Sequence, residues 1–238
     1  MSIYEGLGLD IHKFEVLSFI GGGGKTTAIF SLAEELKKLG KKVLITTTTA
    51  IFNPETGYDY YFLGDINNFK PKKGSITVFG ERVARGKLLD TPPEKISNIV
   101  KEKIFDYILI EADGSKRKPI KGHADYEPVI IKETTTTIGI IGLDALDQRI
   151  DEIVHRPEIF IKLTNTKYSD IISEETIVTY VLNPEGIFNK SKGRKLLILN
   201  KANNKNLVLR ANNIRKLLLD SGFKESVLIT DIKDKMFY

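Results

Sequence analysis

The sequence predicts an α/β fold in which helices cover both faces of a mainly parallel central sheet. Short apolar runs alternate along most of the chain with segments whose apolar residues recur at helical spacing. A glycine-rich turn joins the first apolar run to the first helical segment. Strands that alternate with helices pair in parallel, because each helix returns the chain to the starting edge of the sheet. These observations together predict a three-layer arrangement.

The first unit is a strand, a loop and a helix. Residues 16–20 form a mainly apolar run that ends at the glycines, and residues 26–39 carry apolar side chains at helical spacing. Gly40 is placed to close this helix, and residues 43–47 predict the next strand. The result is a βαβ unit, for which a right-handed crossover is the rule.

The remaining elements follow in the same order after a less regular stretch. Turn residues interrupt the pattern around residues 53–90, where only short strands at 60–63 and 76–79 are predicted. Beyond it we predict helices at 92–104, 174–182 and 207–219, and strands at 107–110, 137–141, 195–199 and 227–229. We therefore expect a single domain spanning 1–238, with an insertion around 53–90.

Composition excludes several classes of function. The chain has no cysteine, which rules out a disulfide framework, a cysteine zinc site or a cysteine-ligated iron–sulfur cluster formed by this chain alone. A formal charge of +5 without regularly interleaved aromatic residues does not indicate nucleic acid binding. No apolar run approaches the roughly 20 residues that span a bilayer, and residues 1–14 lack the pattern of a secretory signal. We therefore expect a cytoplasmic protein that binds neither nucleic acid nor membranes.

The glycine-rich turn has the composition of a phosphate-binding loop. Its four glycines leave room for backbone N–H groups to surround an anion, and the following helix adds the positive end of its dipole. Lys25 would contact the β- and γ-phosphates, Thr26 would be a Mg²⁺ ligand, and Thr27 would bond to the α-phosphate. The motif predicts a P-loop NTPase that binds a nucleoside triphosphate with Mg²⁺, and its glycines are Gly21, Gly22, Gly23 and Gly24.

This loop departs from the usual pattern at one position. Phe19 stands six residues before Lys25, where phosphate-binding loops carry a glycine. A glycine-rich turn with an unrelated lysine is the alternative interpretation. The preceding strand, the following helix and the Gly-Lys-Thr run favour the nucleotide site.

A second acidic element follows the strand predicted at 107–110. Glu111 and Gly114 have the spacing at which phosphate-loop proteins place a carboxylate for the metal's water shell and an N–H group that senses the γ-phosphate. Glu111 would hold Mg²⁺ or orient the attacking water, and a merely solvated acid at the strand end is the alternative. Asp113 is a second candidate for contact with the metal or for deprotonating a substrate. The predicted catalytic residues are therefore Lys25, Glu111 and Asp113.

A cationic segment comes directly after this acidic element. We expect it at the C-terminal edge of the sheet, where ligands of open α/β folds bind. It could hold a second anionic substrate, and a solvated run of charges explains it equally well. The residues concerned are Lys116, Arg117, Lys118, Lys121 and His123.

A third element bears on which base the nucleotide carries. Asn200 and Lys201 follow a predicted strand and resemble the start of the Asn-Lys-x-Asp element by which GTPases read guanine, but Asn203 replaces the aspartate. A carboxylate accepts hydrogen bonds from both guanine donors, whereas an amide has one acceptor oxygen and a competing donor. Asn200 and Lys201 could still flank the base. We therefore expect ATP, with GTP left open.

Several motifs occur in the order seen in one protein family. They are GGGGKTT, the TTTT strand end, EADGSKRKPIK, GLDAL followed by VHRPE, and LILNKAN, spread over residues 16–203. With these motifs the sequence resembles the YqeC-like family, whose members are described as accessory proteins of selenium-dependent molybdenum hydroxylases. The resemblance implies a P-loop NTPase fold, and a molybdenum hydroxylase or a cofactor-loading protein as partner.

The resemblance also draws attention to three residues of the GLDAL and VHRPE segments. Asp144 and His155 could handle a substrate proton, and Arg156 could neutralise a phosphate. The alternative is that Asp144 caps a helix and the other two are ordinary surface residues.

Three functions remain open on sequence alone. The first is an accessory protein that hydrolyses a nucleoside triphosphate. The second is a small-molecule kinase or ATP-dependent ligase similar in fold to dethiobiotin synthetase. The third is a nucleotide-binding regulator without turnover. A homodimer is left open for each of them.

Overall fold

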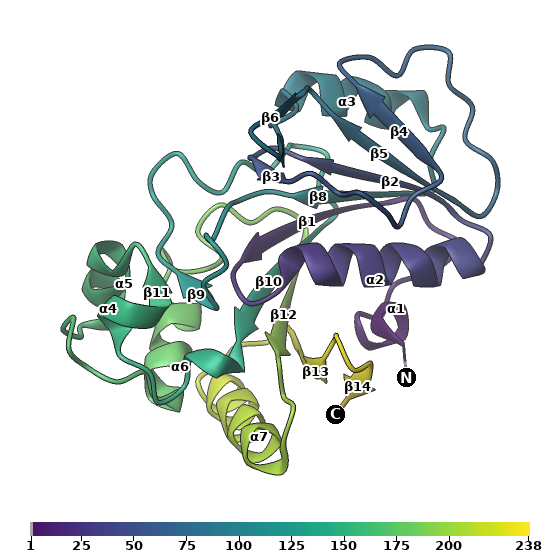
Figure 1. Cartoon of the computed structure of the whole chain (residues 1–238). Helices are drawn as coiled ribbons and strands as arrows, with labels where there is room; N and C mark the ends of the chain where they lie inside the picture. The colour runs from purple at the N-terminus through teal and green to yellow at the C-terminus, as the bar shows by residue number, and fades with distance from the viewer. Residues whose placement is uncertain (1) are drawn as a thin grey trace.

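The computed structural model describes residues 2–238 and is built on a nine-stranded central sheet (Figure 1). Across the sheet the strands run in the order β14-β13-β12-β10-β1-β8-β2-β5-β4. All neighbouring strands of this sheet are parallel except β13 and β14, which pair in antiparallel fashion at one edge. The strands are β1 (Glu15–Gly21), β2 (Lys42–Thr47), β4 (Tyr60–Leu63), β5 (Ser75–Gly80), β8 (Tyr107–Glu111), β10 (Thr136–Gly142), β12 (Arg194–Asn200), β13 (Ser226–Asp231) and β14 (Met236–Phe237).

Helices lie on both faces of this sheet (Figure 1). One face is covered by α2 (Lys25–Lys38) together with the short α1 (Ile3–Gly6). The other face is covered by α3 (Pro93–Glu102), α5 (Pro157–Thr164), α6 (Glu174–Leu182) and α7 (Lys205–Asp220). A 3₁₀ turn, η1 (Leu143–Ala145), and the short helix α4 (Ile150–Ile153) connect β10 to α5. The predicted α/β fold with a mainly parallel sheet and helices on both faces is confirmed.

Alternation along the strands divides the core between the two faces. In β1, Leu17 and Phe19 pack toward α2, whereas Val16 and Ile20 pack toward the opposite face. Successive side chains of a strand point to opposite sides, so a strand covered on both faces is apolar throughout. The full burial of Phe19 explains the missing glycine of the phosphate-binding pattern, because this position still belongs to β1 and fills the core.

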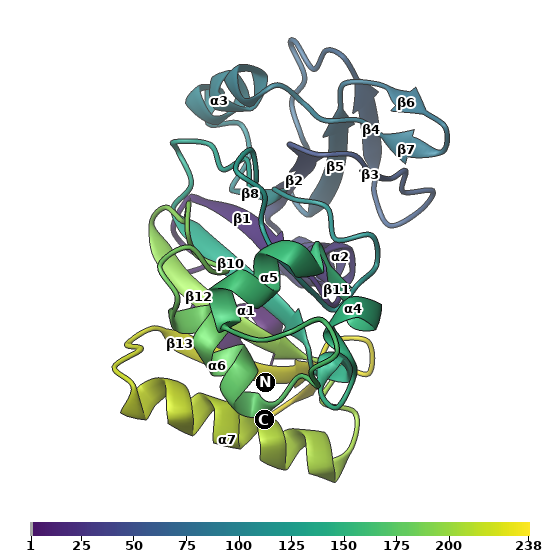
Figure 2. The same cartoon turned by 90° about the vertical axis from the view of Figure 1, so that its left-hand side faces the viewer.

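The segment 53–90 contributes to two different sheets. Its strands β4 and β5 extend the central sheet in parallel, with β5 pairing directly with β2. A separate three-stranded sheet is formed by β3 (Ile51–Phe52), β6 (Val83–Ala84) and β7 (Lys87–Leu88). Figure 2 shows this small sheet beside β4 and β5 at one end of the molecule. Another short parallel pair, β9 (Ile120–Lys121) with β11 (Val154–His155), lies near α5.

Strand order places the predicted site residues together. The strand that leads into the glycines, β1, lies between β10 and β8, and Phe19 is in register with Glu111 of β8. Parallel strands end at the same edge of the sheet, so the loops that follow β1, β8, β2 and β12 meet at their C-terminal ends. The candidate site is built at this edge.

Candidate functional site

The glycine loop is held in shape by its own backbone N–H groups. Gly23 has a φ of 77°, and a Cβ there would lie 2.2 Å from the backbone nitrogen of Gly142, so no larger residue fits. The N–H groups of the first three glycines donate to protein acceptors: Gly21 to the Asp113 carboxylate at 3.0 Å, Gly22 to the Ile140 carbonyl at 2.9 Å and Gly23 to the Lys118 carbonyl at 3.1 Å. These three N–H groups are turned toward the protein, so the N–H groups without such acceptors begin at Gly24.

The start of α2 is the part of the loop whose first N–H groups have no side-chain cap. Gly24 is its N-cap, with a φ of 119° and no side-chain hydrogen bond to the first turn. The first N–H groups of a helix have no partner within it, and together they carry the positive end of the dipole. Gly24, Lys25, Thr26 and Thr27 all line one cavity. A phosphate group entering this cavity would meet these donors.

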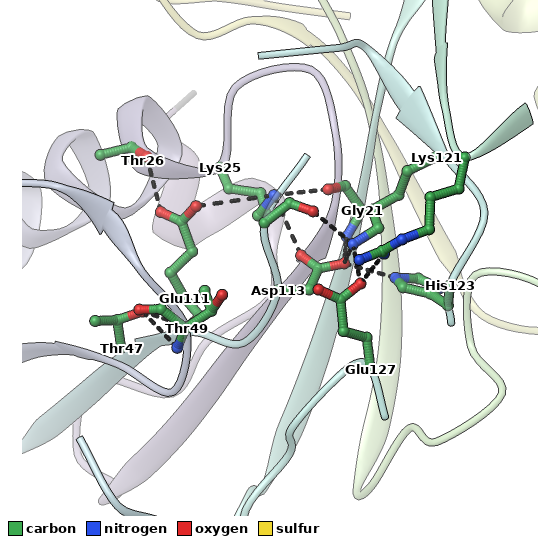
Figure 3. A network of polar contacts seen from close by, with 12 residues as sticks. Gly21, Lys25, Thr26, Thr47, Thr49, Glu111, Asp113, Lys121, His123 and Glu127 are labelled. Carbon is green, nitrogen blue, oxygen red and sulfur yellow. Dashed lines mark hydrogen bonds and ion pairs between the residues drawn. The ribbon is translucent and has the colours of Figure 1, made fainter. Parts of the chain in front are cut away.

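Lys25 is buried at the base of the loop, between the two acidic residues after β8 (Figure 3). Its ammonium donates to the Gly21 carbonyl at 2.6 Å and lies 3.2 Å from Asp113 and 3.8 Å from Glu111. Burial disfavours the charged form, but the carboxylates of Asp113 and Glu111 outweigh it and raise the pKa of Lys25. The ammonium is therefore kept charged at the position where the loop begins.

Glu111 joins the end of β8 to the first turn of α2. Its carboxylate accepts a 2.7 Å hydrogen bond from the Thr26 hydroxyl, and both residues line the cavity. Burial raises the pKa of Glu111, against the opposing effects of Lys25 and Thr26. Gly114 also lines the cavity, so its backbone lies at the same edge.

The donor set at this point suits Mg²⁺. Among residues 2–238 no three His, Cys, Asp or Glu side chains are grouped as a self-contained metal site. Mg²⁺ characteristically takes one or two protein oxygens and completes its octahedron with water and substrate phosphates. The Thr26 hydroxyl and Glu111 carboxylate provide two such oxygens beside the uncapped start of α2.

Asp113 does not face the cavity, which corrects its predicted role as a metal contact or substrate base. It is fully buried behind the loop, where it accepts from the Gly21 N–H and lies 2.6 Å from the His123 Nε2. Burial opposes its ionisation, but Lys25, His123 and Lys121 outweigh this and hold its pKa well below the ordinary value. Asp113 is a buried counterion that positions Lys25 and the loop.

The predicted cationic segment divides into two parts. Lys116 and Arg117 are exposed and line the cavity, as expected for the C-terminal edge. Lys121 and His123 are instead buried around Asp113. The Lys121 ammonium also contacts Glu127 at 2.6 Å and the Gly114 carbonyl at 2.5 Å. The expectation of one solvent-facing cationic loop was therefore wrong for the second part, because β9 carries the chain back into the core.

The cavity at this edge has a volume of about 1040 Å³. This is at the upper end of small-molecule pockets. Besides the loop and Glu111, it is lined by residues of β3, by Lys87 of β7, by segments that follow β8 and β12, and by the start of α5. His155 and Arg156 belong to this lining, as do Lys116 and Arg117, whereas Asp144 does not.

The segment after β12 approaches the other end of the loop. The Asn200 amide donates to the Gly23 carbonyl at 2.8 Å, and its oxygen accepts from the Ile232 N–H at 3.1 Å. Asn200 therefore supports the loop. Lys201 lines the cavity and pairs with Asp144 at 2.6 Å, which accounts for Asp144 without a catalytic role.

Comparison with known proteins assigns the family. A family model described as YqeC protein matches residues 17–158. A relative from Escherichia coli (strain K12), named uncharacterized protein YqeC, is 34% identical over 179 residues, covering 73% of this chain and 70% of its own. The chain belongs to the YqeC family. The match of the YqeC model includes the glycine loop, the acidic element after β8 and the start of α5.

Two solved structures are similar to this YqeC family member at a distance. HypB from Helicobacter pylori, solved in complex with nickel, has a TM-score of 0.45 and 12% identity over 93% of this chain and 80% of that one. Chloroplast FtsY from Physcomitrella patens has a TM-score of 0.32 and 17% identity over 97% of this chain and 57% of that one. Within residues 2–238, no helix is long and apolar enough to cross a membrane.

Several cavity residues escaped the sequence prediction. Phe52, Lys87, Tyr126 and Glu127 line the cavity and come from segments without a recognisable motif. Glu158 also lines it, and it closes the VHRPE segment without having been singled out. Their convergence depends on β3, β7 and α5 folding over the sheet edge.

Proposed function

We propose that this YqeC family member binds a nucleoside triphosphate with Mg²⁺ at the glycine loop and hydrolyses it. The observation that carries the proposal is the Thr26–Glu111 hydrogen bond of 2.7 Å beside a helix start with uncapped N–H groups. Two oxygens from adjacent elements thus lie next to an anion-binding helix terminus. Lys25, the N–H groups from Gly24 to Thr27 and the Gly114 N–H would contact the phosphates.

The roles of these residues follow from their chemistry. Thr26 and Glu111 would hold Mg²⁺, which neutralises charge on the β- and γ-phosphates. Lys25 would exchange its contact with the Gly21 carbonyl for the phosphate oxygens. Glu111 would also orient the attacking water, whose proton leaves as the new bond to phosphorus forms and the bond to the β-phosphate oxygen breaks.

Phosphate release and nucleotide binding test this proposal with three variants. We expect Lys25→Ala to lower affinity for an ATP analogue at least tenfold, and Glu111→Gln to lower the hydrolysis rate on the order of 10²-fold. Lys38→Ala, an exposed lysine at the far end of the same helix, is the matched control. Undiminished hydrolysis in Lys25→Ala would contradict the site assignment. Tight binding in the native protein with no ADP formed would select a regulator without turnover.

ATP is the proposed nucleotide, because the third element lacks the carboxylate that reads guanine. Asn203 is exposed, and its side-chain oxygen accepts from Asn204 at 3.1 Å. An amide in place of the carboxylate weakens the binding free energy of a guanine base by on the order of 2 kcal/mol. We expect Asn203→Asp to raise GTP affinity about tenfold without matching change for ATP, with Asn203→Ser as control. Equal changes for both nucleotides would reject this assignment.

An accessory role in maturing a molybdenum hydroxylase, or in loading its cofactor, is the proposed purpose. Family membership supports it, since YqeC-like proteins are described in those terms. Bound nucleotide would control docking with the hydroxylase or a cofactor-loading protein in the cytoplasm. Co-purification from the native cell with Lys25→Ala and unaltered protein tests this, because capture that is independent of Lys25 would exclude nucleotide control.

The size of the cavity favours a second candidate, a small-molecule kinase. The lining continues well beyond the loop to Arg117 and Arg156. In this function the γ-phosphoryl group would leave the β-phosphate oxygen and bond to an acceptor oxygen, with the acceptor proton released to solvent. A phosphorylated metabolite in mass spectra of reaction mixtures would distinguish it from simple hydrolysis.

A further inference from the structure

The cavity has two sides, which the strand order separates. Lys201 follows β12, which lies two strands from β1 on one side of it. Phe52 lies in β3, the element after β2, and Arg117 follows β8; both β2 and β8 lie on the other side of β1. Asn200 and Lys201 lie where the predicted base-reading element meets the loop. A nucleotide that extends toward Lys201 leaves the opposite side free. We call this opposite side, formed by Phe52, Lys87, Lys116, Arg117, Tyr126, His155 and Arg156, the distal subsite.

Two guanidinium groups of the distal subsite are held against aromatic rings. Arg117 lies 4.3 Å from the ring centre of Phe52, and Arg156 lies 5.4 Å from that of Tyr126. Both rings are well exposed, at 56% for Phe52 and 69% for Tyr126. Stacking holds a guanidinium plane in place. Among residues 2–238 Arg117 makes no other polar contact, so its N–H donors stay available, whereas Arg156 already donates to the Glu127 carboxylate and, at 2.9 Å, to the Tyr126 hydroxyl. Such pre-organised donors suit the bidentate recognition of phosphate.

The distal subsite carries uncompensated positive charge. Among residues 2–238, Lys87, Lys116 and Arg117 take part in no ion pair, although all three line the cavity. Of the cavity's acids, Glu127 is already paired with Lys121 and Arg156, and Glu158 is exposed on the first turn of α5. An anion would meet an excess of cationic partners.

His155 borders the distal subsite and carries an unpartnered polar atom. Its Nδ1 is buried and has no hydrogen-bond partner among the described residues, although the ring borders the cavity. Burial, together with Lys121, Arg156 and Lys116, lowers its pKa to about 4, so the ring is neutral and in a positive potential. Two residues after it begins α5, whose N-terminus has no side-chain cap and also borders the cavity. A buried polar atom without a partner is costly unless a ligand satisfies it.

The distal subsite is fixed to the phosphate loop by the backbone. The Lys118 carbonyl accepts from the Gly23 N–H at 3.1 Å, so the turn carrying Lys116 and Arg117 is attached to the loop itself. A Cβ on Gly22 would lie 2.6 Å from the same carbonyl, which shows how closely the two segments approach. A ligand of the distal subsite would therefore lie beside the nucleotide phosphates.

We propose that the distal subsite binds a second small molecule that bears a phosphate group, held by Arg117 and Lys116 next to the nucleotide. This inference rests on the proposed nucleotide site, because it assigns the second substrate or effector of the same cavity. The concave shape and the volume of about 1040 Å³ fit a small molecule beside a nucleotide. Phosphate is favoured because the stacked guanidinium of Arg117 and the ammonium of Lys116, neither of them in an ion pair with any described residue, line the same cavity.

Histidine NMR gives a direct test, since the chain has only three histidines. Inorganic phosphate is titrated at pH 7 into protein saturated with a non-hydrolysable ATP analogue and Mg²⁺. We expect the His155 imidazole signals to shift and saturate, while those of the exposed His12 stay fixed. Arg117→Ala should weaken phosphate binding at least tenfold. Arg82→Ala, an exposed arginine outside the cavity, is the matched control and should bind as the unaltered protein does.

A parallel titration separates this inference from the nucleotide proposal. Lys25→Ala without nucleotide removes the loop's own phosphate contact, so a His155 shift that persists there supports a separate subsite. A His155 signal that never moves, or equal affinity in Arg117→Ala and Arg82→Ala, would overturn the inference. Failure of the analogue to bind the unaltered protein would overturn the nucleotide proposal instead, and the titration without nucleotide would then decide the distal subsite.

Discussion

Asp113 is the residue whose charge the fold depends on most directly. Its carboxylate contacts the Gly21 N–H at 3.0 Å, the His123 Nε2 at 2.6 Å, the Lys25 ammonium at 3.2 Å and the Lys121 ammonium at 3.3 Å. Water does not screen these four contacts, because the Asp113 side chain is fully buried. Asp113→Asn keeps the shape but removes the charge, and it points an amide donor at a set of donors.

The cost can be worked out from the partners left behind. Breaking a buried ion pair typically costs about 3–5 kcal/mol, because the remaining charge is uncompensated. Lys121 would keep Glu127 at 2.6 Å and Lys25 would keep Glu111 at 3.8 Å, so the lower end, about 3 kcal/mol, is expected. For a domain of this size that corresponds to a melting temperature lower by roughly 6–12 °C.

Urea unfolding followed by circular dichroism, without nucleotide, measures this loss. Asp234→Asn, an exposed aspartate near the end of the chain, is the control and should change the free energy of unfolding by less than about 0.5 kcal/mol. Adding Lys121→Met to Asp113→Asn should recover part of the loss, because the stranded cation is removed. A loss below about 1 kcal/mol for Asp113→Asn would refute the counterion role.

Three further predictions concern the loop and the cavity wall. Gly23→Ala should lower ATP-analogue affinity at least tenfold, since its Cβ meets the Gly142 backbone at 2.2 Å; Gly40→Ala, also at positive φ but with open space, isolates the backbone effect and should keep affinity unchanged. Asn200→Ala should lower the free energy of unfolding, measured in urea, by about 2–3 kcal/mol, because the Gly23 carbonyl and the Ile232 N–H lose their partner. The exposed Asn203→Ala is the control, and equal stability of the two variants would contradict this prediction. The lowered pKa of His155 predicts that stability falls as pH drops from 6.5 toward 4, because the unfolded chain then binds a proton that the folded chain refuses. After discounting for partial exposure the effect is about 1–2 kcal/mol, and His155→Asn should flatten this slope in pH-dependent urea unfolding while His12→Asn does not.

Local sequence was sufficient to predict the strand, the glycine turn and the helix that position Lys25 and Thr26. Lys25 and Thr26 follow the glycines directly, and their placement needs only a strand, a tight turn and a helix. Glu111 ends the neighbouring strand, so its meeting with Thr26 at 2.7 Å required one further fact, the adjacency of β1 and β8. The parallel pattern made that adjacency a reasonable expectation.

Other roles depended on which way a side chain turns after a strand ends. Asp113 and Glu111 are two residues apart and looked equivalent in sequence, yet Asp113 points behind the loop to Lys121 and His123. The short pairing of β9 with β11 places Lys121 in the core. No apolar pattern in the sequence predicted this pairing. The first three glycines likewise turn their N–H groups to protein acceptors that are distant in sequence.

The sequence by itself determined the α/β class, the order of the main strands and helices, and the identity of the loop with Lys25, Thr26 and Glu111. The spacing of apolar residues and the positions of turn-forming residues are local properties of the sequence. They can therefore be recognised without knowing how the elements pack against one another. Only the tertiary structure decided that Asp113 is a counterion, that Asn200 supports the loop, and that Phe52, Arg117, His155 and Arg156 share one cavity. These contacts join segments far apart in the chain, and their geometry follows from how the loops pack over the sheet edge.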